Sequence, residues 1–187
     1  MQKQETKKMV LGAVLTALVI ILQFLGAFVK FGPFSISLVL VPIVIGGAIC
    51  GKKIAAWLGF VFGMVVLLNG DAAAFMAVNP WGTIITVLLK GTLCGLLAGI
   101  TYDIFKKNRY LRVISSAIIC PVVNTGIFLI GWIIFFMPTL SVWANGSNVW
   151  EYMIFVLVGG NFLVELVANI ILSPIIIRLL SIKKITN

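Results

Sequence analysis

Apolar residues occur along this chain in runs long enough to cross a lipid bilayer, which takes about 20 residues of helix. Four long runs cover residues 9–29, 81–105, 113–137 and 152–180, and two shorter, glycine-rich runs cover residues 36–50 and 54–68. The pattern predicts an all-α bundle of six membrane-spanning helices. The two short runs have an alternative interpretation as a re-entrant pair, because short glycine-rich segments can enter a bilayer without crossing it.

The positions of the basic residues test this count independently. All but two of the 14 lysines and arginines lie before the first run, between the second and third, between the fourth and fifth, or at the end of the sixth. These residues are Lys3, Lys7, Lys8, Lys52, Lys53, Lys106, Lys107, Arg109, Arg112, Arg178, Lys183 and Lys184. Six spans place all of them on one side of the membrane, and an odd number would not. Because positively charged loops stay in the cytoplasm, both termini are predicted to be cytoplasmic.

The composition agrees with a membrane protein and excludes several other classes. Of the 187 residues, 61% are hydrophobic and only 10% charged, and the mean hydropathy is +1.19. A soluble domain carries about 25% charged residues. The net charge of +9 does not indicate nucleic-acid binding, because the cations lie between long apolar runs. Residues 1–187 are therefore predicted to form a single transmembrane domain. Its first run is longer than the apolar part of a cleaved signal peptide.

Two residue types narrow the chemistry. The chain has no histidine, which excludes a histidine base or a histidine-ligated metal. The cysteines Cys50, Cys94 and Cys120 lie singly inside apolar runs, so we interpret them as small packing residues rather than as a disulfide framework or a metal site. No cofactor, metal or catalytic residue is expected.

Polar side chains inside the apolar runs are costly in a bilayer and mark functional candidates. Lys90 lies about nine residues into the fourth run, or about 14 Å deep at helical rise. Asn161, Glu165 and Asn169 form one stripe along the sixth run, and Asn124 lies in the fifth. We expect these three spans to line one cavity. In the alternative interpretation, Lys90 and Glu165 only neutralise each other and the asparagines only hold helices together.

Three segments connect the spans on the predicted outer side, at residues 30–35, 69–81 and 138–151. Trp81, Trp143 and Trp150 lie there, where interfacial aromatic residues anchor membrane proteins. Glycine and proline in these segments also suit movable covers over a site. A site that opens outward below such covers indicates capture of a solute from outside.

The chain carries no recognisable device for energy conversion. It lacks a phosphate-binding G-x-x-x-x-G-K-[ST] loop, and no inverted repeat is evident. If it takes part in transport, another subunit is expected to supply the energy. Ala13 and Ala17, four residues apart in the first run, offer a surface on which another membrane helix can pack closely.

Several short motifs occur in a fixed order along the chain. They are Ala13-x-x-x-Ala17, Gly32-Pro33-Phe34-Ser35, Asn79-Pro80, Lys90-Gly91 followed by Gly95 to Gly99, and Val123-Asn124-Thr125. In this order and spacing, and over nearly its whole length, the chain resembles the substrate-binding S components of energy-coupling factor (ECF) vitamin transporters.

The resemblance implies a six-helix bundle in a prokaryotic plasma membrane that binds a water-soluble vitamin near the outer face. It implies partners as well, namely a transmembrane T subunit that contacts Ala13 and Ala17, and two ATPases that drive it. The substrate residues it indicates are Lys90, Asn124, Asn161, Glu165, Phe34, Asn79 and Trp81.

The resemblance favours an anionic vitamin. Pantothenate-type members are similar in having a basic residue after the Asn-Pro pair, and a lysine in a low-dielectric site attracts a carboxylate strongly. Pantothenate is therefore the first choice of ligand. Riboflavin is the second, with Phe34 and Trp81 placed around the flavin ring.

Two other functions remain open at this point. A stand-alone solute carrier or channel would use the same cavity without a partner. A structural membrane subunit would use the polar stripe only to hold its helices together. An enzyme is not expected, because Lys90, Glu165 and Asp71 form no nucleophile–base pair with a recognisable spacing.

Overall fold

The computed structural model describes residues 2–26, 30–31, 34–35, 38–105, 108–146, 148–153 and 160–181 of the chain, with side chains at 4–26, 38–105, 108–146, 148–153 and 162–178. The helices are α1 (Gln2–Gly26), α2 (Leu40–Cys50), α3 (Lys52–Leu68), α4 (Ala73–Val78), α5 (Pro80–Ile104), α6 (Arg109–Phe135), α7 (Met137–Trp143), α8 (Val149–Glu151) and α9 (Gly160–Ser181). Two short antiparallel strands, β1 (Lys30–Phe31) and β2 (Phe34–Ser35), pair Lys30 with Ser35 and Phe31 with Phe34.

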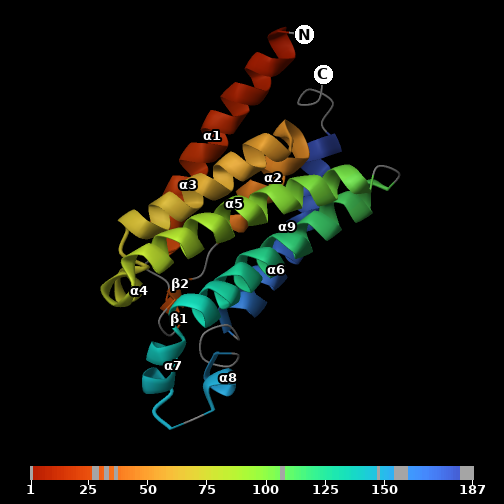
Figure 1. Ribbon diagram of the computed structural model, residues 1–187. Helices are drawn as coiled ribbons and strands as arrows, with labels where there is room; N and C mark the ends of the chain where they lie inside the picture. The colour runs from red at the N-terminus through yellow and green to blue at the C-terminus, as the bar shows by residue number, and fades with distance from the viewer. Residues whose placement is uncertain are drawn as a thin grey trace.

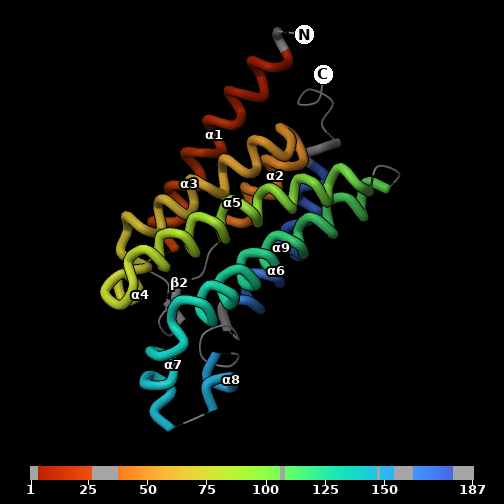
Figure 2. The backbone as a smooth tube through the Cα atoms, viewed as in Figure 1, coloured from red at the N-terminus to blue at the C-terminus, as the bar shows by residue number. Residues whose placement is uncertain are grey.

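The long helices lie side by side in one bundle (Figure 1). At one end of the bundle α1 begins, α2 turns into α3, α5 ends, α6 begins and α9 ends (Figures 1 and 2). The β1–β2 hairpin and the short helices α4, α7 and α8 lie at the opposite end. The basic side chains described at Lys7, Lys8, Lys52, Lys53, Arg109, Arg112 and Arg178 therefore belong to the first end, as the charge pattern predicted. The side of the membrane that this end faces stays a prediction.

Each of the six predicted spans contains a helix, but the helices differ in length. Among the described residues, α1, α5 and α6 are long and apolar enough to cross a membrane. By contrast, α2 has 11 residues, and at about 1.5 Å rise per residue it covers about half of a hydrocarbon core of about 30 Å. The six-span count and its re-entrant alternative therefore stay predictions.

The outside of the bundle is apolar, as lipid contact requires. Large side chains such as Leu25 on α1, Ile134 on α6 and Ile171 on α9 are 57%, 65% and 66% exposed. Soluble monomers rarely expose apolar surface on this scale. Meanwhile Cys50, Cys94 and Cys120 are free and buried, which confirms their interpretation as packing residues.

The helix α3 packs against α5 with the two backbones almost in contact. Gly51 makes the tight turn from α2 into α3 at φ 96°, a left-handed conformation that glycine adopts without strain. Further along, Gly59 of α3 and Gly91 of α5 face each other. A Cβ atom on either glycine would overlap the carbonyl oxygen of the other. This close approach fixes the position of α5, which carries Lys90.

The outer segments are more regular than the sequence suggested. Residues 30–31 and 34–35 pair as strands, and α4, α7 and α8 occupy much of the segments that were expected to be loops. The expectation was wrong there because buried side chains anchor these short helices: Phe75 of α4 is 6% exposed and Leu140 of α7 is 0% exposed. Segments of six or seven residues cover fewer than two helical turns, which is too short for a helical pattern of apolar residues to be detected in the sequence.

The helix α1 also begins earlier than its apolar run. It starts at Gln2 and continues through the basic segment, where Lys8 Nζ lies 3.9 Å from Glu5 Oε1 one turn earlier. The polar start of the helix thus extends beyond the part suited to lipid. Residues 27–29, at the other end of the predicted first span, lie outside the described residues.

Candidate functional site

Lys90 lies on the inward side of α5 between two aromatic rings. Its Nζ is 5.5 Å from the ring centre of Phe62 on α3 and 5.2 Å from that of Phe128 on α6. Both distances are within the range in which the negative face of a ring attracts a cation. Glu165 and Asp71 lie within electrostatic range of the same ammonium group. The cation predicted near the middle of the membrane is therefore held at the meeting point of three helices.

Glu165 and two asparagines form a buried group between α6 and α9. Asn124 Nδ2 on α6 is 3.5 Å from Glu165 Oε2, and Asn169 Nδ2 donates to the Glu165 backbone oxygen at 2.8 Å. The three side chains are only 1–5% exposed. The predicted stripe on the sixth run therefore faces inward at Glu165 and Asn169. The side chain of Asn161, its third member, lies outside the described residues.

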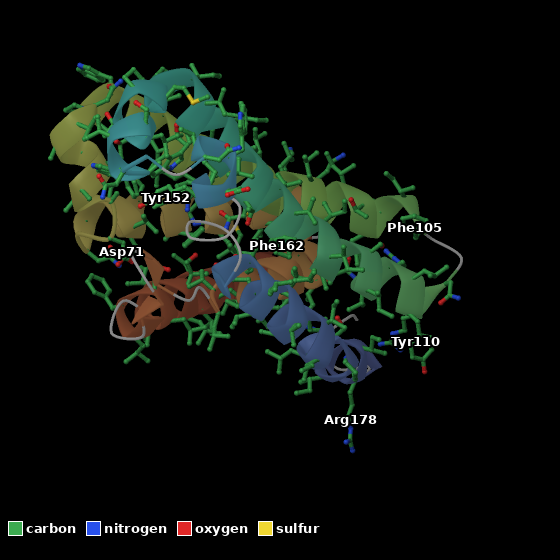
Figure 3. All side chains as sticks on the ribbon, turned by 90° about the horizontal axis from the view of Figure 1, so that it is seen from below. Asp71, Phe105, Tyr110, Tyr152, Phe162 and Arg178 are labelled. Atoms are coloured by element: carbon green, nitrogen blue, oxygen red, sulfur yellow. The ribbon has the colours of Figure 1, made fainter. Side chains whose placement is uncertain are left out.

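A second polar group surrounds Asp71, in the turn between α3 and α4. Gln23 Nε2 of α1 donates to Asp71 Oδ2 at 2.8 Å, and Asn69 Nδ2 donates to the same oxygen at 3.0 Å. Asn69 Oδ1 in turn accepts a hydrogen bond from the Asp71 backbone at 3.0 Å. Figure 3 shows Asp71 at the same end of the molecule as Tyr152, with Phe105, Tyr110 and Arg178 at the other. This group therefore joins α1 to the end of the bundle that carries the short helices.

Four buried oxygens at these groups have no hydrogen-bond partner in the described part of the chain. They are Gln23 Oε1, Thr86 Oγ1, Asn124 Oδ1 and Asn169 Oδ1. A buried polar atom without a partner costs about 1–3 kcal/mol, so native proteins rarely keep several of them together. Such atoms at the groups around Glu165 and Asp71, and at Thr86 one turn before Lys90 on α5, mark these polar groups as more than packing.

Aromatic side chains connect the region to the short outer helices. Phe75 of α4 contacts Trp132 of α6 with ring centres 4.6 Å apart, and Phe128 at 6.2 Å. Trp132 also packs on Trp143 of α7 at 5.8 Å. Trp143 is thus part of an aromatic cluster, whereas the sequence indicated an anchor at the membrane surface. Because Phe128 touches both Lys90 and Phe75, the cluster is continuous with the polar region.

The remaining predicted substrate residues lie apart from this polar region or outside the description. Asn79 caps the start of α5, where its Oδ1 accepts from Gly82 N at 3.0 Å. Trp81 is 76% exposed, which separates it from the buried groups. Phe34 belongs to β2, and its side chain is outside the described residues.

The predicted coupling residues Ala13 and Ala17 are exposed on α1. The opposite face of that helix carries Leu15 and Val19, which are 5% and 0% exposed and pack into the core. The described residues of this chain therefore leave the Ala13–Ala17 face uncovered, so that a helix of another subunit has room to pack there.

Sequence reasoning missed Gln23, Asp71 and Thr86. Gln23 and Thr86 carry the same signal that identified Lys90, since each is a polar side chain within an apolar run. Asp71 gave no such signal, because it lies in a connecting segment where a charged residue is ordinary.

Comparison with known proteins places this arrangement in context. The family model described as "ECF transporter, substrate-specific component" matches residues 7–179. The chain is 26% identical over 199 aligned positions to a protein named pantothenic acid transporter PanT from Lactococcus lactis subsp. cremoris (strain MG1363), and the alignment covers 97% of each chain. No solved structure matches the chain.

Proposed function

We infer the function from one premise: this chain belongs to the family of ECF transporter substrate-specific components. It is therefore a membrane protein and the substrate-binding subunit of a transporter rather than an enzyme. We propose that it captures a water-soluble vitamin at the end of the bundle that carries α4, α7 and α8. It would then pass the vitamin to a T subunit driven by two ATPases. Pantothenate is the proposed ligand, as the name of the Lactococcus relative suggests.

The observation that carries the ligand proposal is the environment of Lys90. Its ammonium is placed against the faces of Phe62 and Phe128, and the carboxylates of the region have amide donors of their own. Asp71 accepts from Gln23 and Asn69, and Glu165 is beside Asn124. The positive charge is therefore available to a ligand carboxylate, whose attraction to it is much stronger in a low-dielectric interior than in water.

The residues proposed to contact the ligand are those of this region. They are Lys90, Asn124, Glu165 and Asn161, with Phe34, Asn79 and Trp81 proposed on the segments that cover it. Ala13 and Ala17 are proposed as the contact with the T subunit, which their exposure on α1 supports. The basic end of the bundle, where α1 begins and α9 ends, is proposed to face the cytoplasm.

The experiment that tests the function is mass spectrometry of small molecules released from the full chain after purification from rich medium. We expect pantothenate in a one-to-one ratio with protein. Riboflavin in its place would overturn the ligand but keep the binding function. A protein that released nothing, and that no vitamin stabilised in a thermal-shift panel, would instead favour a structural subunit.

A further inference from the structure

The buried oxygens without partners carry information about the ligand. Gln23 Oε1, Asn124 Oδ1 and Asn169 Oδ1 are amide carbonyl oxygens, which can only accept hydrogen bonds. Thr86 Oγ1 is a hydroxyl oxygen that is likewise buried and has no hydrogen-bond partner among the described residues. The described residues thus leave a surplus of acceptors in this region.

The orientation of each amide is determined by its neighbour. Asn169 Nδ2 donates to a backbone carbonyl oxygen at 2.8 Å, and Gln23 Nε2 donates to Asp71 Oδ2 at 2.8 Å. Asn124 Nδ2 faces Glu165 Oε2 at 3.5 Å. All three partners are acceptors, so rotating an amide by half a turn would bring two acceptor oxygens together. The amide oxygens are therefore held in place as unsatisfied acceptors, by a carboxylate for Gln23 and Asn124 and by a backbone oxygen for Asn169.

These acceptors lie on the same helix faces as the cation and its rings. Thr86 precedes Lys90 by one turn of α5, and Asn124 precedes Phe128 by one turn of α6. Residues four apart on a helix share a face. Since Phe128 contacts Lys90, the residues that carry the oxygens of α5 and α6 each lie one helical turn from this contact. On α9, Glu165 lies within electrostatic range of Lys90, and Asn169 follows Glu165 by one helical turn.

We propose that Asn124 and Asn169 bind hydroxyl or amide N–H groups of a ligand whose carboxylate is bound by Lys90. This inference rests on the proposed function and specifies its substrate class, a carboxylate that also carries two or more hydrogen-bond donors. A metal cation would satisfy carbonyl oxygens equally well, but the neighbouring ammonium of Lys90 repels it. The oxygens are buried, so the ligand reaches them only when the atoms that cover them move aside.

Pantothenate meets this requirement with its own functional groups. It has one carboxylate for Lys90, and one amide N–H and two hydroxyls as donors. Riboflavin has hydroxyls on its ribityl chain but no carboxylate, so it would leave Lys90 without an anion. The surplus of acceptors and the cation of Lys90 together therefore favour a hydroxylated carboxylate.

The first test compares three compounds by calorimetric titration of the purified full chain. Dideoxypantothenate replaces both hydroxyls of pantothenate with hydrogen, and panthenol replaces the carboxylate with a primary alcohol. We expect dideoxypantothenate to bind about tenfold more weakly than pantothenate, since each lost hydrogen bond weakens binding by a few-fold. Equal affinities for these two compounds would overturn the inference and leave the proposed function intact. If neither binds, the proposed ligand is wrong and the inference fails with it.

The second test locates the hydroxyl contacts. Asn124→Leu and Asn169→Leu remove an acceptor with little change in side-chain volume, so the preference for pantothenate over dideoxypantothenate should decrease in each. Ser116→Ala is the matched control, because the Ser116 hydroxyl is buried but donates to the Ala98 backbone oxygen at 2.8 Å. It should keep the full preference. The ratio of two affinities on one variant does not depend on that variant's stability. A preference that persists in both asparagine variants would overturn the assignment.

Discussion

At the scale of single residues, Lys90 shows how the structure accommodates a charge in an apolar bundle. A lysine at the centre of a bilayer costs about 2.5–3.5 kcal/mol on insertion scales. Two ring faces, at 5.2 Å and 5.5 Å, each return about 0.5–2 kcal/mol. The two quantities are comparable, so the rings offset much of the cost of placing the ammonium at this position. The structure thus stabilises Lys90 with rings on two neighbouring helices.

A prediction for a single residue concerns Lys90→Met, a substitution that nearly keeps the length of the side chain and removes its charge. Pantothenate should bind more than about tenfold more weakly, a loss of about 1.4 kcal/mol, because its carboxylate loses its cation. Panthenol has no carboxylate, so its affinity should stay unchanged in the same titration. An equal loss for both compounds would mean that Lys90 only supports the structure.

At the scale of elements, the position of α5 depends on glycines that contact α3. Gly59 and Gly91 allow the two backbones to approach, and Gly95 and Gly99 continue the same face of α5. A Cβ at Gly95 would meet the Ala55 backbone, and one at Gly99 would come within 2.6 Å of Lys52 Cα. Close backbone packing at small residues is the usual way in which membrane helices associate. It places Lys90 opposite Phe62.

A prediction at this scale concerns Gly59→Ala. The added methyl group would overlap the Gly91 carbonyl oxygen, a rigid backbone atom, so α3 and α5 must separate. Such overpacking costs about 1–3 kcal/mol, and the thermal unfolding temperature of the purified protein should fall. Gly126→Ala on α6 is the control, since its Cβ would meet nothing within 4 Å. There alanine should be neutral or stabilising, because it favours a helix by about 1 kcal/mol over glycine. Equal unfolding temperatures for the two variants would contradict the close contact.

At the scale of the whole molecule, the two ends of the bundle differ in chemistry. One end carries the described basic residues, and the other carries the hairpin, the short helices and the aromatic cluster. The polar groups around Lys90 and Asp71 connect to the second end through Phe128 and Phe75. Along the side of the bundle, α1 presents Ala13 and Ala17 outward. The proposed binding region and the proposed coupling surface are therefore on different parts of the molecule, and mutations can separate them.

Ala13→Trp and Ala17→Trp test that separation. Each places a bulky side chain on the exposed face of α1, so uptake of pantothenate with the T subunit and ATPases should be lost in proteoliposomes. Pantothenate binding to the isolated chain should be retained, because neither alanine contacts the polar groups. Ile134→Trp, at an apolar position of α6 that is 65% exposed, is the control and should transport normally. A parallel loss of binding in the alanine variants would show that this face supports the site instead.

The long helices were predictable because the insertion of a segment into a membrane depends on the composition of that segment. Apolar runs marked each long helix, and the same rule that identified Lys90 and Glu165 as polar residues within apolar runs applies to Gln23 and Thr86. The short helix α4 was not predictable, since its six residues are held by the burial of Phe75 against Trp132, a residue far along the chain. For Asn79 the ligand contact stays a prediction, and the structure adds a role that the sequence did not indicate, since its side chain accepts from Gly82 N and caps α5.

The amino-acid sequence alone was therefore enough to indicate a membrane protein, the positions of its long helices, and the polar residues that lie within apolar runs. Each of these features depends on the free energy of transferring a segment from water to lipid. That free energy is set by residues that are neighbours in the sequence. The contact of Gln23 with Asp71 and the two rings beside the Lys90 ammonium became known from the folded structure, as did the amide oxygens of Asn124 and Asn169 that have no partner among the described residues. Those contacts depend on how each helix is rotated against the others, and packing at sites such as Gly59 and Gly91 sets that rotation.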